Sequence, residues 1–158
     1  MPVIDVQFSA LPAHVRTARL VASAVARRAG VADRVLDEVR IAVGEACSRA
    51  VDLHQRYVPT EAVRMEISDD RGRLGVTVID AAPGAADADR DGIGSGRYDP
   101  ASIAESADLA AGERPLDCLP DGFGLAVIRA LADEVDITPE PAGAGTRIRM
   151  SWAVDGVS

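Results

Sequence analysis

The chain of 158 residues is 47% hydrophobic and 27% charged, which is typical of a globular protein and predicts a single domain over 1–158. Its formal net charge of −8 and its aromatic content of 3% argue against direct binding to nucleic acid, which relies on basic residues and stacking rings. An acidic surface instead suits basic protein partners.

The first third of the chain is predicted to contain one strand and two helices. Residues 3–10 alternate apolar and polar side chains, as an edge strand does. A helical pattern covers 12–29 and is followed by Gly30, the residue type preferred after a helix C-terminus. Asp33 is a candidate N-cap for a second helix, which extends to about residue 55. The apolar face of that helix consists of Leu36, Val39, Val43, Ala46, Cys47 and Ala50.

The rest of the chain is predicted to contain four strands and one further helix. Two runs rich in β-branched residues, 62–67 and 74–80, flank the stretch SDDRGR and predict a hairpin. A third helix covers about 125–131, and strands follow at 134–140 and 146–154. This order of elements predicts an α+β fold, a two-layer sandwich with a mostly antiparallel sheet and the helices on one face.

A long connection separates the hairpin from the third helix. Residues 81–121 are rich in Ala, Gly, Asp and Pro and lack a sustained period. Connections of this length are uncommon inside a compact domain and are usually functional lids or disordered inserts. We interpret 85–121 as a mobile lid.

The cysteines and the hydropathy pattern indicate neither a metal site nor a membrane span. Cys47 and Cys118 lack the spacing of metal ligands or of a disulfide framework. Cys47 lies within the second helix and is interpreted as a small buried hydrophobe. No apolar run reaches the roughly 18 residues of a membrane-spanning helix, so we expect a cytoplasmic protein.

The stretch GEACSRAV, residues 44–51, places two opposite charges on an apolar helix. Glu45 and Arg49 are four positions apart, so they are neighbours on the helix surface, in the order that favours an ion pair. The simplest interpretation is a solvated salt bridge of small energy. A functional interpretation depends on the other motifs of the chain.

Four short stretches occur in a recognisable order: EACSRA on a helix, DAAPG after a strand, GFGL at the start of a helix, and GT at 145–146. Together they resemble the GHKL ATPases, and among these the bacterial anti-sigma-factor serine kinases. The resemblance covers nearly the whole chain. It implies the GHKL (Bergerat) ATP-binding fold, with ATP as the cofactor.

The resemblance implies a purine site around Asp80. This carboxylate is similar to the family's Asp that accepts a hydrogen bond from the adenine amine, and Thr146 looks like the hydroxyl that supports this contact. Gly84 matches the position where the backbone approaches the purine closely. Ala82 departs from the family pattern, which has Gly there, so its methyl group either crowds the purine or stiffens the turn. Without the resemblance, Asp80 reads as an ordinary turn residue.

The resemblance also implies roles in phosphate binding and catalysis. Gly122 and Gly124 resemble glycines at a helix N-terminus, where backbone N–H groups favour phosphate oxygens, although a flexible helix start has the same pattern. Glu45 matches the catalytic carboxylate that activates the attacking hydroxyl or water. Arg49 occupies the position of an Asn that holds Mg²⁺, and a guanidinium has no acceptor for a cation. Arg49 is therefore expected either to pair with Glu45 or to contact phosphate, and Mg²⁺ binding is doubtful.

These features favour an anti-sigma factor that sequesters a sigma factor and is released by an anti-anti-sigma (STAS-type) partner, with weak or lost kinase activity. The alternative is an active ATP-dependent protein serine kinase that phosphorylates the anti-anti-sigma factor. A stand-alone ATP-binding regulator is a third reading. The two histidines, His14 and His54, lie in ordinary helical contexts, which argues against a histidine kinase. The resemblance also implies a homodimer, with a contact that includes 11–30.

Overall fold

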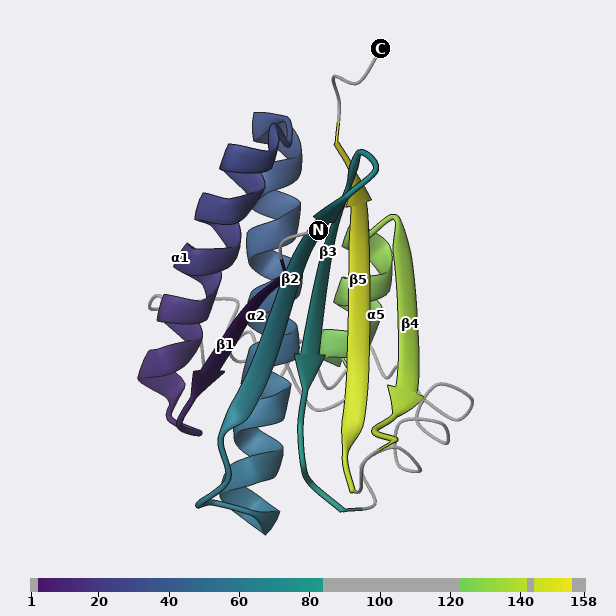
Figure 1. Cartoon of the computed structure of the whole chain (residues 1–158). Helices are drawn as coiled ribbons and strands as arrows, with labels where there is room; N and C mark the ends of the chain where they lie inside the picture. The colour runs from purple at the N-terminus through teal and green to yellow at the C-terminus, as the bar shows by residue number, and fades with distance from the viewer. Residues whose placement is uncertain (1–2, 84–122, 142–143, 155–158) are drawn as a thin grey trace, which may run out of the picture.

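The computed structural model describes residues 3–83, 123–141 and 144–154. These residues form three helices and five strands (Figure 1). In chain order the elements are β1 (Val3–Phe8), α1 (Pro12–Ala29), α2 (Asp33–Tyr57), β2 (Val63–Asp70), β3 (Arg73–Ile79), α5 (Phe123–Leu131), β4 (Glu134–Pro139) and β5 (Thr146–Ala153).

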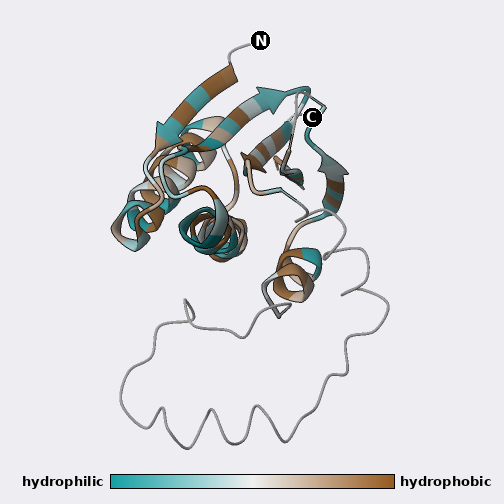
Figure 2. Cartoon of the chain, turned by 90° about the horizontal axis from the view of Figure 1, so that it is seen from below, coloured by the Kyte–Doolittle hydropathy of each residue, from teal (hydrophilic) through white to brown (hydrophobic). Residues whose placement is uncertain are grey.

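The five strands form one sheet in the order β1-β2-β3-β5-β4, and every neighbouring pair is antiparallel. The helices lie on one side of this sheet (Figure 2), and α2 contacts both α1 and α5. The prediction of an α+β sandwich with a mostly antiparallel sheet and helices on one face is confirmed. No helix in the described part of the chain is both long and apolar enough to span a membrane.

The core lies between the sheet and the helices. Across the sheet, Met65 on β2 lies opposite Val78 on β3, which lies opposite Ile148 on β5, and none of the three is more than 2% exposed. All six residues of the predicted apolar face of α2 are buried. Burial raises the pKa of the Cys47 thiol to about 12, so this cysteine is an inert core residue, as predicted.

The element boundaries agree with the local sequence signals, with one exception. Gly30 ends α1 in the left-handed conformation, with φ +89°. The β2–β3 turn consists of Arg71 and Gly72, both with positive φ, as in a tight hairpin turn. The prediction of Asp33 as an N-cap is wrong, because the cap is Ala32 and Asp33 is already helical. At this position the negative charge of Asp33 still favours the positive end of the helix dipole.

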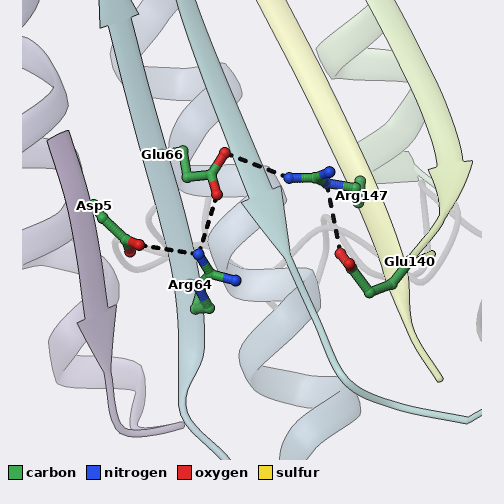
Figure 3. A network of polar contacts seen from close by, with 5 residues as sticks. All are labelled: Asp5, Arg64, Glu66, Glu140 and Arg147. Carbon is green, nitrogen blue, oxygen red and sulfur yellow. Dashed lines mark hydrogen bonds and ion pairs between the residues drawn. The ribbon is translucent and has the colours of Figure 1, made fainter. Parts of the chain in front are cut away.

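The face of the sheet opposite the helices is polar. Arg64 contacts Asp5 at 2.9 Å and Glu66 at 3.1 Å, and Arg147 contacts Glu66 at 3.4 Å and Glu140 at 3.5 Å (Figure 3). The side chains are partly exposed to water, so each pair stabilises the fold little. The network nevertheless keeps this face hydrophilic, while the opposite face carries the core.

Candidate functional site

The turn that follows β3 is held by hydrogen bonds from three consecutive backbone N–H groups. The N–H of Asp80 donates to the carbonyl of Thr146 at 3.0 Å, and the N–H of Ala81 donates to Nε2 of His54 at 2.8 Å. The N–H of Ala82 donates to Oδ1 of Asp80 at 3.0 Å, which is the Asx-turn bond expected of a turn-forming Asp. Each N–H group of the turn therefore has a partner on the protein.

Asp80 is also paired with the arginine of the GEACSRAV stretch. Nη1 of Arg49 lies 3.2 Å from Oδ2 of Asp80, and their side chains are 17% and 2% exposed. The two residues are 31 positions apart in the sequence, so no local spacing rule indicates the pair. The structure thus brings together Arg49 from α2, Asp80 and Ala82 from the turn, and Thr146 from β5, a group called here the Asp80 cluster.

Thr146 begins β5 directly beside the turn. Thr146 is fully buried, and its Oγ1 makes no hydrogen bond to any residue that the structure describes. Buried hydroxyl groups usually have a partner, so a lone one beside a buried carboxylate is a candidate contact for a bound group. Ala82 is fully buried as well, and its methyl group is enclosed by protein.

Glu45 lies one helical turn before Arg49, at the contact between α2 and α5. It is 8% exposed, and a Cβ built on Gly124 would lie 3.2 Å from its Oε2. The second residue of α5 therefore packs against this carboxylate. The structure brings together the predicted catalytic residue and one of the two predicted phosphate-binding glycines. The other, Gly122, lies outside the described residues, as do Gly84 and the predicted lid at 85–121.

Two residues of this region were not predicted from the sequence. His54 is fully buried, and its ring lies between the carbonyl of Glu61, at 2.9 Å from Nδ1, and the N–H of Ala81. Gly145 has φ +118°, and a Cβ there would overlap the backbone carbonyl of Asp80. Gly145 was visible in the GT stretch, but only the structure shows that the turn requires it.

The sequence matches a known family over most of its length. The sequence model of the histidine kinase-like ATPase domain covers residues 8–152. The chain belongs to this family. Membership agrees with the GHKL resemblance.

A solved structure supports the same fold. The RsbU and RsbW domains of Rv1364c from Mycobacterium tuberculosis match with a TM-score of 0.62 and 16% sequence identity. The match covers 98% of this chain but 32% of that one, so this chain spans about a third of the length of the matched protein. No curated protein matches the chain. At this identity the likeness establishes the fold of the histidine kinase-like ATPase domain and not its partners.

Proposed function

We propose that the protein is an anti-sigma factor that binds a sigma factor without needing phosphotransfer, and that an anti-anti-sigma protein releases it. The observation that carries the proposal is that position 49 is an arginine. Arg49 stands where the resemblance places a Mg²⁺ ligand, and its guanidinium is paired with Asp80. An arginine offers donors only, while Mg²⁺ requires oxygen ligands in near-octahedral geometry. The described residues therefore do not fit a Mg²⁺ ion at this position.

The remaining residues of the cluster fit a nucleotide better than they fit the metal. The buried Asp80 carboxylate and the Thr146 hydroxyl would face the base, with Ala82 in the turn beside it. Gly84, Gly122 and Gly124 are the proposed backbone contacts to base and phosphates, as the resemblance implies. ATP is thus the proposed ligand, bound weakly and with little dependence on Mg²⁺.

The proposed main activity is binding to protein. The net charge of −8 suits basic protein surfaces, and the matched structure of RsbU and RsbW domains contains the same fold. Sequestration depends on the outer surface, whereas phosphotransfer depends on Glu45 and position 49. A change at position 49 can therefore remove catalysis and leave binding intact. Because sigma factors act on RNA polymerase in the cytoplasm, the proposal places the protein there.

The test is a reconstitution with purified components. The chain is first used to isolate partners from a lysate of its own organism, and the sigma factors identified are then purified. We expect the chain to bind one of them and to inhibit transcription that depends on it. Addition of the matching anti-anti-sigma protein should restore transcription without transfer of phosphate. Failure to bind any sigma factor of that organism would refute the proposal.

The alternative of an active serine kinase is supported by one observation. Glu45 is retained, largely buried, and in contact with the start of α5, as a general base would be. The same reconstitution with labelled ATP distinguishes the two functions. Rapid Mg²⁺-dependent labelling of a serine on the anti-anti-sigma protein, abolished by Glu45→Gln, would establish the kinase instead.

We also propose a homodimer formed through β1 and α1. β1 is an edge strand, hydrogen-bonded on one side to β2, so its other edge suits pairing with a second copy. Val3, Leu11 and Leu20 are 54%, 51% and 63% exposed, respectively. Ala26 lies within the predicted contact segment 11–30, but it is fully buried in the protein's own core and is not available for this contact.

Light scattering at micromolar concentration tests the dimer. We expect the wild type to have twice the mass of one chain and Leu20→Glu to shift the equilibrium to monomer, because a charge would replace apolar contact area. Tyr57→Glu is the control for a charge at an exposed apolar position outside β1 and α1, since Tyr57 is 57% exposed at the end of α2. A monomeric wild type, or dissociation by both substitutions, would contradict the proposal.

A further inference from the structure

Both oxygens of the Asp80 carboxylate already accept hydrogen bonds from the protein. Oδ1 accepts from the N–H of Ala82 at 3.0 Å, and Oδ2 accepts from Nη1 of Arg49 at 3.2 Å. We propose that Arg49 determines the specificity of this site. By pairing with Asp80 it competes with the adenine amine and so weakens the binding of adenine nucleotides. The inference rests on the proposed nucleotide site and adds how that site is regulated.

The pair is stronger than the contact that a base would offer. A guanidinium and a carboxylate form a charge-assisted hydrogen bond, roughly twice as strong as one between neutral groups. The Asp80 side chain is 2% exposed, and this burial strengthens the electrostatic attraction. The amine of adenine is a neutral donor. It would meet a carboxylate whose charge is already balanced by Arg49, and displacing Arg49 would separate a largely buried ion pair.

The turn cannot easily move to free the Asp80 carboxylate, because its backbone is fixed by hydrogen bonds. The N–H groups of residues 80, 81 and 82 are all hydrogen-bonded, to Thr146, His54 and Asp80 respectively. The Asp80 side chain cannot turn away from Arg49 without losing the hydrogen bond that its Oδ1 accepts from the N–H of Ala82. The Arg49 side chain is long and 17% exposed, so in this proposal it is the group that moves when a nucleotide binds. The apparent affinity for the nucleotide is therefore lowered by the fraction of molecules in which Arg49 has left Asp80.

Calorimetric titration of the full chain with ATP, with and without Mg²⁺, tests the inference. We expect Arg49→Met to bind ATP about tenfold more tightly than the wild type, since the substitution keeps an unbranched apolar stem and removes the charged competitor. Arg49→Lys should stay close to the wild type, because an ammonium group can still pair with Asp80. Arg40→Met is the control for loss of one charge on α2, since Arg40 pairs with Asp37 at an exposed site.

A double substitution identifies where the gain arises. In the Arg49→Met background, Asp80→Asn should cancel the gain, because the uncovered carboxylate is what the base would use. Unfolding curves identify any variant that does not fold, and Arg49→Lys then still tests the charge. Equal affinities of wild type and a folded Arg49→Met, or the same gain in Arg40→Met, would overturn the inference. The titration uses no partner protein, so its result is independent of whether a sigma factor binds.

Discussion

Substitution Gly145→Ala is expected to destabilise the protein by about 4 kcal/mol or more, among the largest effects of any single methyl group in this chain. Gly145 has φ +118°, a conformation that residues with a Cβ rarely adopt. The added Cβ would also overlap the carbonyl oxygen of Asp80 and lie 2.9 Å from Cα of Ala81. All the clashing atoms belong to the backbone of the turn, so no side chain can rotate to relieve them.

Gly30→Ala is the matched control for this prediction. Gly30 also has positive φ, +89°, but a Cβ there would meet only Cγ1 of Val154, at an ordinary 3.7 Å. Backbone strain alone should cost about 1 kcal/mol at this position. Urea unfolding of both variants separates strain from overlap. Similar losses in the two variants would show that the β5 backbone is not held against the turn as the structure indicates.

The fold could be predicted from the sequence because its signals are local. The 3.6-residue period of the α2 face, the hairpin turn at 71–72 and the glycine after α1 each depend on a few neighbouring residues. The one local error, the N-cap of α2, is a shift of a single residue. Long apolar periods specify an element strongly, whereas its first residue depends on weak capping energies.

The candidate site could be predicted only in part, because its central contact is not local. The spacing of Glu45 and Arg49 predicts a contact between these two residues, but it does not predict that Arg49 contacts Asp80, directly after β3. That pairing exists because α2 packs against the sheet, and the spacing of residues along the sequence does not predict this packing. Asp80 and Thr146 were both predicted for this site, and the structure joins them by a backbone hydrogen bond. Their roles toward a nucleotide stay predictions.

His54 shows the same limit for a single side chain. From the sequence it is one polar residue near the end of a helix, and helix ends usually lie near water. In the structure it is fully buried, because the turn after β3 and the segment after α2 both close over it. A backbone N–H can only donate, so Nε2 accepts from Ala81 and the ring proton lies on Nδ1, directed at Glu61. The ring thus acts as a bridge between two segments.

His54→Ala is accordingly expected to destabilise the protein by about 3 kcal/mol, as the sum of a cavity and two partly buried backbone groups that lose their partner. His14→Ala is the matched control, because His14 also lies 3.0 Å from a backbone carbonyl, that of Ser9, but at an exposed site. We expect its loss to be below about 0.5 kcal/mol. Urea unfolding measures both values.

Amide hydrogen exchange distinguishes a bridge from a simple core residue. If His54 holds the turn, the amide of Ala81 should exchange much faster in His54→Ala than in the wild type. The exchange rates of amides in the middle of β3 should change only as much as the global stability changes. His54→Gln, which keeps a polar side chain, should restore part of the protection at Ala81. Uniform acceleration across β3 and the turn would instead mean that His54 only fills space, and that the geometry at Asp80 is set by β5 and Gly145 without it.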